Sequence, residues 1–432
     1  MTSPIRYLTG ITTTGTPHLG NYVGALRPAV QASRRPGTEN FYFLADYHAL
    51  IKCDDPARMQ RSTLEIAACW LATGLDPEAV FFYRQSDIPE ITELTWLLTC
   101  VTGKGLLNRA HAYKAQLDKN LEAGLDPDQD VTAGLFMYPV LMAADILMFK
   151  AHRIPVGRDQ VQHIEMARDM ASSFNHLYGE HLVLPEAEVD ESVAMLPGLD
   201  GRKMSKSYDN VIALFAPREQ MRRQIFSIVT DSRAPGEPKE AQGSALFQIF
   251  QAFASADETQ QLLDAYASGI AWSDAKQLLF ERIDREIAPM REKYDHLVAH
   301  PGELEDILKR GAAKARERAT PFMAELRDAV GLRNLARRAA PAKEAKAKAA
   351  LPQFKQYREA DGKFYFKLVD AQGRLLLQSK GFDSPQQAGR RVAELRSTAS
   401  GPHLGDGMVE LAPGIVLTEV SSALQELTDA GN

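Results

Sequence analysis

Residues 9–21 of the chain read TGITTTGTPHLGN, and this stretch decides the fold. It follows an apolar and aromatic start at Ile5, Tyr7 and Leu8 and precedes a helix-like run from Tyr22 to Gln31. A strand, a Gly/Thr-rich turn and a helix N-terminus in this order present backbone N–H groups and the helix dipole to a phosphate. The glycine spacing matches neither GxGxxG nor GxxxxGKS/T, so neither the dinucleotide fingerprint nor the P-loop applies.

Strand and helix patterns alternate from Ile5 to about Val193, which predicts a parallel sheet with helices on both faces. We therefore expect an α/β fold with a Rossmann-like, doubly wound parallel-sheet domain over residues 1–207. A ligand of such a domain lies at the carboxyl ends of its strands.

Beyond Ser207 the pattern becomes helical, because apolar residues recur at i, i+3 and i+4. The predicted helices are Pro217–Val229, Ser244–Phe253, Glu258–Tyr266, Trp272–Ala299 and Glu303–Val330. We assign 208–302 to an α-helical domain and expect the last helix, about 303–332, to pack back on the sheet domain.

The C-terminal part begins with a basic Ala/Lys/Pro segment, 333–350, which predicts a solvated linker. This segment either tethers the next domain or contacts an RNA backbone. Residues 351–432 predict a small α+β accessory domain that ends in an acidic tail without Lys or Arg.

In this small domain we expect three short strands, Phe354–Arg358, Phe364–Val369 and Leu375–Ser379, followed by one helix from Ser384 to Glu394. Residues 408–417 add strands or pack against the sheet. The pattern resembles the YegP-type domains of unassigned role. Its alternating basic and aromatic residues fit an RNA-binding face, and ordinary cross-strand pairs on a half-exposed sheet explain them equally well.

A second glycine-loosened loop, GRKMSKS at 201–207, is cationic. Lys203 and Lys206 are separated by two residues and can reach one anion from a bending backbone, while the serines add small donors. Alone, such a loop is ordinary solvated chemistry. Together with the N-terminal turn it predicts a polyphosphate site.

These residues match a known family. PHLGN at 17–21 resembles the HIGH signature of class I aminoacyl-tRNA synthetases, and 203–207 spells their KMSKS signature. The segments 133–147 and 154–165, with DYHAL at 46–50, are similar to the tryptophanyl type over the whole of their lengths. The resemblance runs from about Tyr7 to about Gly331, and we expect it to stop beyond about Ala350.

The resemblance implies a reaction with ATP and Mg²⁺, the metal being held by phosphates and not by a protein site. L-tryptophan is activated to its adenylate with release of pyrophosphate, and is then transferred to the 3′-terminal adenosine of tRNA(Trp). Residues 1–207 become the catalytic domain and 208–302 the anticodon-binding domain of a homodimer. A tyrosyl-type enzyme and a non-catalytic paralogue that acts as a binding module are the alternatives.

Asp145 lies in an apolar helical run, 141–149, where an unpaired carboxylate would cost several kcal/mol. Its donor is a structural Arg, a backbone N–H or, as the resemblance implies, the indole N–H of tryptophan. The resemblance assigns the rest of the tryptophan pocket to Leu8, Gly10, His48, Met142, Ile146, Ile154, Val156 and Gln160. In that assignment Gly10 lets the flat ring approach the backbone, and His48 and Gln160 contact the polar end of the ligand.

For catalysis the resemblance implies Lys203, Lys206, His18 and Lys114. His18 is otherwise a structural histidine, and Lys114 an ordinary surface lysine. The ATP contacts implied are Thr12, Thr13, Thr14, Gly20, Asn21, Gly157, Arg158, Asp159, Ala194, Lys203, Met204, Ser205, Lys206 and Ser207. Thr12 departs from the commoner bacterial pattern, which has Gln there, and a hydroxyl is shorter and donates only one hydrogen bond.

Composition and the cysteine positions indicate the number of domains and argue against a membrane protein, a zinc site and a disulfide. The chain has 432 residues, 45% of them hydrophobic, which is more than one ordinary domain needs. It has no apolar run of membrane-spanning length and no signal-peptide core at its start, so we expect no membrane contact and a cytoplasmic location. The three cysteines, Cys53, Cys69 and Cys100, lack CxxC spacing, so the sequence predicts neither a zinc site nor a disulfide.

Overall fold

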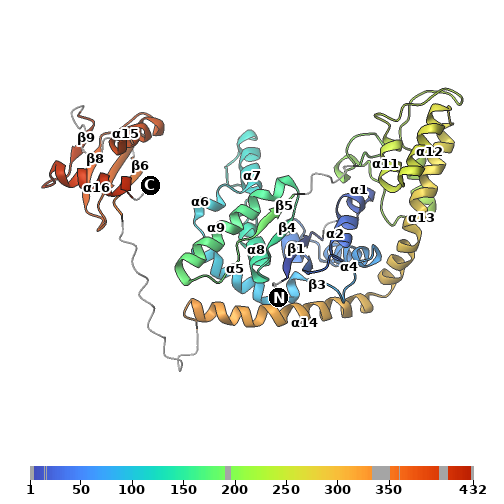
Figure 1. Ribbon diagram of the computed structural model, residues 1–432, viewed down its shortest axis with the longest axis horizontal. Coiled ribbons are helices and arrows are strands. Elements are labelled where there is room, and N and C mark those ends of the chain that lie inside the picture. The colour runs from blue at the N-terminus through green and yellow to red at the C-terminus, as the bar shows by residue number, and fades with distance from the viewer. Residues whose placement is uncertain are drawn as a thin grey trace. The chain divides into compact units, whose positions relative to one another are not determined.

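The computed structural model describes residues 4–13, 15, 17–189, 196–332, 351–359, 361–397 and 407–429. They belong to two compact units, Met1–Asn334 and Leu335–Asn432, which are described separately below (Figure 1). The predicted linker, 333–350, lies outside the described residues. None of the described helices combines the length and apolar character needed to cross a bilayer.

The first unit is built on a parallel sheet, which confirms the predicted α/β class. Its strands are β1 (Ile5–Ile11), β2 (Thr38–Leu44), β3 (Phe81–Arg84), β4 (Arg153–Pro155) and β5 (Glu186–Glu188). They are ordered β3-β2-β1-β4-β5, and all pairs are parallel. The chain order reverses between β1 and β4, and a crevice opens at such a switch point outside the carboxyl ends of the strands.

Both faces of this sheet are buried. Neighbouring residues along each strand point to opposite faces, and they belong to two different hydrophobic cores. Leu8 and Phe43 belong to one hydrophobic core, and Ile11 and Leu44 belong to another. The helices of the Leu8 side include α5 (Pro89–Val101), α8 (Ala133–Met148) and α9 (Val161–Tyr178). In Figure 1 these helices lie on one side of the strands, and α4 (Pro56–Ala72) lies on the other.

Short elements position the residues at the sheet edge. They are α3 (Asp46–Ala49), η2 (Gln85–Asp87), α6 (Lys104–Leu107), α7 (His111–Glu122), η3 (Arg158–Gln160) and η4 (Lys206–Tyr208). The helix after β1 begins at Leu19, earlier than predicted, and consists of α1 (Leu19–Asn21), the π-helical η1 (Tyr22–Leu26) and α2 (Arg27–Ala32). His18 caps its start through a reciprocal capping box with Asn21.

The predicted helices after residue 207 are all present, with ends shifted by one or a few residues. They are α10 (Arg218–Phe226), α11 (Ala245–Phe253), α12 (Ala256–Ala267), α13 (Trp272–Ala299) and α14 (Pro301–Ala329). The core that contains Ile11 continues through α10, α11 and α13. Tyr22 donates to Glu286 Oε1 of α13 at 2.8 Å and stacks on Phe253 of α11 at 6.0 Å. The helical part therefore shares a hydrophobic core with the sheet.

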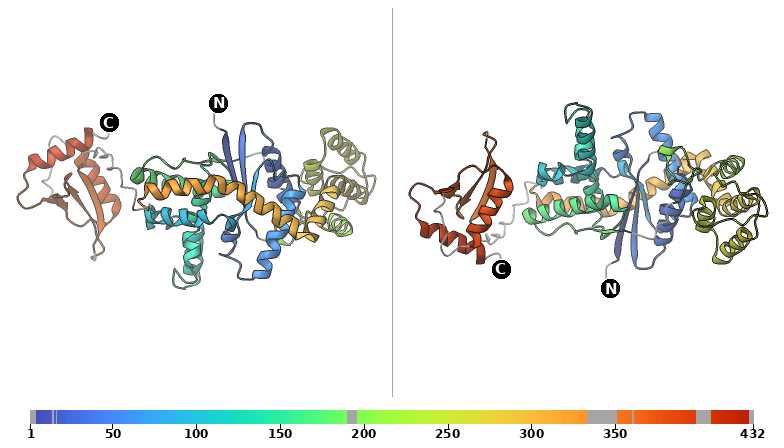
Figure 2. Two further views of the ribbon diagram at one scale, coloured as in Figure 1. Left: turned by 90° about the horizontal axis from the view of Figure 1, so that it is seen from below. Right: turned by 90° about the horizontal axis from the view of Figure 1, so that it is seen from above.

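The long helix α14 returns along the edge of the sheet, and Figure 2 shows it crossing the strands. At the crossing a Cβ on Gly311 would lie 1.7 Å from the carbonyl oxygen of Phe82, so only glycine permits this approach. Lys314 Nζ donates to the carbonyl oxygen of Val80 at 3.1 Å. The edge strand β3 is thereby covered.

The second unit corrects the expected fold of the C-terminal part. It contains a four-stranded antiparallel sheet of β6 (Gln353–Arg358), β7 (Phe364–Val369), β8 (Leu375–Ser379) and β9 (Val409–Leu411), with α15 (Pro385–Ser397) and α16 (Leu417–Asp429). The predicted three-stranded sheet with one helix lacked β9 and α16. The lack of Lys and Arg suggested a tail, yet Val420 and Leu424 bury one face of α16 in the core.

Candidate active site

A cavity of about 660 Å³ opens at the carboxyl ends of β1, β2 and β4. All nine residues that the sequence assigned to tryptophan border it, and Thr12 does too. The remaining lining residues, which the sequence did not single out, are Phe43, Ala45, Ala49, Ile51, Lys52, His111, Ala112, Leu135, Tyr138, Pro155 and His163. The cavity therefore lies at the switch point of the sheet, where α/β folds bind ligands.

Asp145 is the buried charge of this cavity. Its side chain on α8 is fully buried, and its oxygens accept hydrogen bonds from Gln85 Nε2 at 2.8 and 2.9 Å. His48 Nε2 lies 2.9 Å from Asp145 Oδ2. Burial raises the pKa of Asp145, while the hydrogen bonds and charge of His48 and the Gln85 hydrogen bond act in the opposite direction. The donors to Asp145 are thus an amide and an imidazole, and neither is the arginine or backbone N–H that the sequence also allowed.

Gln85 was not foreseen. It follows the buried strand β3, is itself fully buried, and its Oε1 accepts the N–H of Tyr47 at 3.1 Å. A polar residue directly after the carboxyl end of a strand that begins with buried aromatic residues is the signal that marked it. Because the same amide is fixed at its oxygen and its nitrogen, the position of Asp145 is fixed too.

The cavity is lined by both apolar and polar side chains. Tyr138 and His163 meet through a hydrogen bond of 2.5 Å between the hydroxyl and Nε2. Gly10 has a second reason to be glycine besides the expected one, because a Cβ there would lie 2.8 Å from Cζ of Phe43. The glycine makes room for the Phe43 ring, and that ring forms part of the wall.

His18, at the end of the N-terminal turn, lies near the charged side chain of Lys206, outside the cavity. His18 is nearly buried, and burial, followed by the charge of Lys206, lowers its pKa to about 4. Its Nδ1 accepts the N–H of Asn21 at 3.3 Å. A neutral ring that accepts at Nδ1 carries its proton on Nε2, so His18 is a neutral donor at that atom.

The KMSKS loop lies against this turn, although the two are far apart in sequence. A Cβ on Gly15, which has φ of +71°, would lie 2.6 Å from Lys206 Nζ. Burial lowers the pKa of Lys206, and the carboxylate of Glu65 opposes this change. The N–H of Leu19 donates to the carbonyl oxygen of Ile212 at 2.9 Å, which joins the two segments through the backbone.

Asn210 holds the loop and was missed by the sequence. Its Oδ1 accepts the N–H of Ser205 at 2.8 Å, and its Nδ2 donates to the carbonyl oxygen of Lys203 at 3.1 Å. Met204 is buried in the core beside Gly20, so its side chain lies away from the cavity. Lys203, Lys206 and Ser207 are exposed.

Several predicted ATP contacts lie elsewhere. Thr13 is buried and its hydroxyl faces Met59 Sδ at 3.7 Å, whereas Thr12 borders the cavity. Lys114 is exposed on α7, and only the first turn of that helix borders the cavity. Gly157 and Arg158 are exposed after β4. Thr14, Ala194 and the side chain of Asp159 lie outside the described residues.

Comparisons with known proteins agree with this architecture. A sequence model of the family described as tRNA synthetases class I (W and Y) matches residues 1–287. A tryptophan–tRNA ligase from Xanthomonas axonopodis pv. citri is 66% identical over 402 residues, which are 92% of this chain and 93% of the relative. The tryptophanyl-tRNA synthetase of Campylobacter jejuni, solved with ADP and tryptophan, is 41% identical with a TM-score of 0.70 and covers 76% of this chain and 100% of its own.

One relative corrects an expectation about the C-terminal part. A tryptophan–tRNA ligase from Xylella fastidiosa (strain Temecula1) is 61% identical over 432 residues, which are 99% of this chain and 98% of that protein. The resemblance to tryptophanyl enzymes therefore does not stop at about Ala350. The second unit is shared with at least this relative, while the whole Campylobacter chain corresponds to a smaller part.

Proposed function

The chain belongs to the class I tRNA synthetases of the tryptophan and tyrosine family, and from that premise we propose how its residues join L-tryptophan to tRNA(Trp). ATP and tryptophan form tryptophanyl-adenylate and pyrophosphate, and the tryptophanyl group then passes to the 3′-terminal adenosine of the tRNA. The protein is an ATP-dependent tryptophan–tRNA ligase, as relatives of 66% and 61% identity are.

The observation that carries the choice of tryptophan is Asp145. It is a fully buried carboxylate at the edge of a largely apolar cavity, and two side-chain donors keep it oriented. An indole N–H is a donor only and would add a hydrogen bond to this acceptor. A phenylalanine ring would leave the acceptor without that hydrogen bond, which a buried site penalises strongly.

The apolar walls hold the ring. Leu8, Met142, Ile146, Ile154 and Val156 border the cavity on the sheet and on α8. Burying an aromatic side chain against such walls is favourable by roughly 25 cal/mol per Å² of apolar surface. His48, Gln160 and Thr12 border the same cavity, and we assign them to the ammonium and carboxylate end of the substrate.

Catalysis by this chain is electrostatic. The neutral His18 donates its Nε2 proton to a hydrogen bond with the transferring phosphate, and Lys203 and Lys206 stabilise the charge that develops on the leaving pyrophosphate. His18 and both lysines offer no anionic ligand, so Mg²⁺ would be held by the phosphate oxygens of ATP and would supply further charge stabilisation there. The tryptophan carboxylate attacks the α-phosphate, so no protein nucleophile is needed.

The macromolecular partners follow from the reaction. We assign the α10–α13 region to the anticodon end of tRNA(Trp), as the resemblance to the family implies. Tyr22 and Arg27 couple this region directly to the helix that His18 caps. A homodimer in the cytoplasm, where tRNA is charged, is the assembly we propose. Analytical ultracentrifugation of the full chain tests the dimer, and we expect a mass equal to that of two chains.

The amino-acid-dependent exchange of labelled pyrophosphate into ATP tests the proposed function. We expect exchange with tryptophan and none above background with the other standard amino acids. Exchange that requires tyrosine would support the tyrosyl alternative, and exchange with none would support a non-catalytic paralogue. Charging of a tRNA(Trp) transcript by the same preparation tests the second step.

A further inference from the structure

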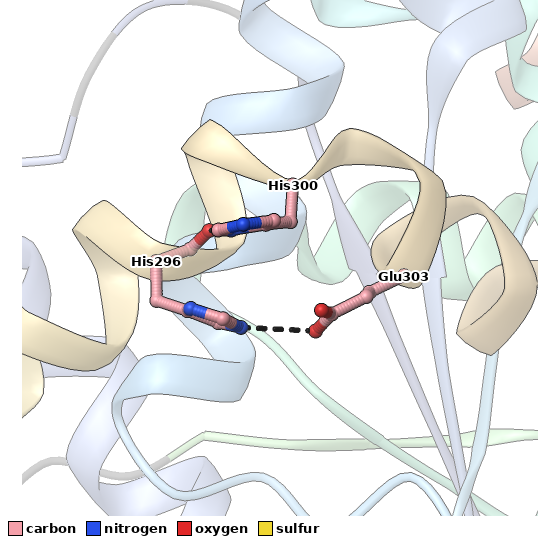
Figure 3. A group of neighbouring side chains, drawn as sticks. All are labelled: His296, His300 and Glu303. Carbon is pink, nitrogen blue, oxygen red and sulfur yellow. Dashed lines mark hydrogen bonds and ion pairs between the residues drawn. The ribbon is translucent and has the colours of Figure 1, made fainter.

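A cluster of two histidines and a glutamate lies at the corner between α13 and α14, where the chain passes from the helical part to the edge of the sheet. Among the residues that the structure describes, the side chains of His296, His300 and Glu303 each offer a ligand atom within 4.8 Å of the others (Figure 3). His296 Nε2 lies 3.1 Å from Glu303 Oε2. All three residues are exposed, so an ion in solvent reaches them directly.

The ring of His300 already has the tautomer that coordination through Nε2 requires. Its Nδ1 lies 2.8 Å from the carbonyl oxygen of His296, and only a protonated nitrogen donates to a carbonyl. In the neutral ring this leaves the Nε2 lone pair free of a proton. A metal-binding histidine ordinarily donates its other ring N–H to a carbonyl or carboxylate, and in His300 such a hydrogen bond selects the tautomer.

The cluster contains a second histidine that an exposed ion pair would not require. A pair between His296 and Glu303 alone would contribute little to stability, because both side chains are more than half exposed. It would not need a second imidazole. The two rings nevertheless stack with centroids 4.3 Å apart and planes at 28°, which places two imidazole rings beside one carboxylate.

Binding requires only a side-chain adjustment. Ligand atoms of a tetrahedral ion at about 2.1 Å lie about 3.4 Å apart, close to the 3.1 Å between His296 Nε2 and Glu303 Oε2. The His300 ring must turn out of its stack so that its Nε2 points at the same centre. His296 must carry its proton on Nδ1, which the exposed ring reaches by exchange with water.

We propose that His296 Nε2, His300 Nε2 and the Glu303 carboxylate form a binding site for a divalent transition-metal cation of the zinc class, with water in the fourth position. Two imidazoles and one carboxylate are ligands that zinc accepts and that magnesium and calcium seldom use. The ion would tie the last turn of α13 to the first turn of α14 and would brace this corner. The site lies outside the cavity and the KMSKS loop, so it takes no part in adenylate formation.

Zinc titration of the full chain by calorimetry, after treatment with EDTA and removal of any affinity tag, tests the site. We expect one zinc ion per chain and a higher midpoint of thermal unfolding in its presence. His300→Ala should weaken zinc binding at least about tenfold, since even outer partners of a ligand contribute that much. Glu303→Gln keeps a hydrogen-bond acceptor for His296 but removes the anionic ligand, and should also weaken binding.

His176→Ala is the matched control, because His176 is an exposed histidine at the end of α9, on another helix from the cluster. It should bind zinc like the wild type. A cobalt(II) spectrum of tetrahedral type, lost in His300→Ala, would further support the site. The proposal is wrong if the wild type binds no zinc, or if His300→Ala and Glu303→Gln bind it with unchanged affinity while their unfolding midpoints without metal match that of the wild type.

Discussion

Gln85 Nε2 lies 2.8 Å from Oδ1 and 2.9 Å from Oδ2 of Asp145, so one buried amide holds both oxygens of a fully buried carboxylate. The carboxylate comes from α8 and the amide from the turn after β3. Since Gln85 Oε1 accepts the N–H of Tyr47, which precedes His48, the two donors to Asp145 are tied to one backbone segment. Tryptophan selection should therefore depend on Gln85, although in our assignment Asp145 and not Gln85 contacts the indole.

Gln85→Met should raise the KM for tryptophan more than it lowers kcat. Removing the donor leaves a buried acceptor less satisfied, at a cost of about 1–3 kcal/mol, or roughly 5- to 150-fold. The pH dependence separates positioning from general damage. Burial raises the pKa of Asp145 and Gln85 lowers it, so the variant should lose tryptophan affinity at a higher pH than the wild type as the pH falls. Gln220→Met, at an exposed position of α10, is the control. An unchanged KM and pH profile would remove this role from Gln85.

Asp145→Asn should weaken discrimination between tryptophan and phenylalanine. The amide can turn its own donor toward the indole N–H, which replaces attraction by repulsion, and we expect kcat/KM for tryptophan to fall by about 2–4 kcal/mol of transition-state stabilisation. The value for phenylalanine should change much less. Pyrophosphate exchange with both amino acids measures the ratio, and a ratio equal to that of the wild type would contradict our assignment of the indole contact.

Lys206→Ala should depress turnover without a matching loss of tryptophan binding. Lys206 lies at Gly15 and lowers the pKa of His18, so its charge acts at the phosphate end and away from the indole end. One lost electrostatic partner of a transition state typically costs about 10²- to 10³-fold in kcat. Lys293→Ala, an exposed lysine of α13, is the control. Wild-type kcat in Lys206→Ala would remove the loop lysine from the mechanism.

The sequence was informative where chemistry is local. The two signatures and the segment around Asp145 carry the resemblance that assigned roles to individual residues, and the nine residues assigned to the pocket do border one cavity. It failed where a partner comes from another segment, as with Gln85 for Asp145 and Tyr138 for His163. It also missed Asn210, which lies only three residues beyond the KMSKS loop, because the spacing does not show that the chain turns back to place this amide against the loop backbone. Thr13 illustrates a further limit, because a turn residue can face the core or the ligand and only packing decides between them.

Loss of the second unit should leave adenylate formation intact. The cavity, His18 and the KMSKS loop all belong to residues 1–334, and the whole Campylobacter synthetase corresponds to 76% of this chain. A chain ending near residue 340 should therefore retain tryptophan-dependent pyrophosphate exchange. Lost exchange in a soluble, folded truncation would show that the second unit contributes to the active site. Retained exchange with weaker tRNA charging would assign that unit to the second step.

His18 makes stability depend on pH in a calculable direction. Its pKa is about 4 in the folded chain, because of burial and then the charge of Lys206, and about 6.5 when unfolded. The unfolded chain therefore binds a proton first as the pH falls, and the contribution of the neutral ring is complete above pH 6.5 and is lost toward pH 4. Between pH 7 and pH 5 the loss of stability amounts to about 2 kcal/mol.

His18→Gln keeps an acceptor for the N–H of Asn21 but does not titrate, so the free energy of unfolding of this variant should fall less between pH 7 and pH 5. Urea titrations followed by the fluorescence of Trp70, Trp96 and Trp272, which all lie in the first unit, measure the difference. An equal fall in the variant and the wild type would mean that His18 titrates normally and is not the neutral donor of the mechanism.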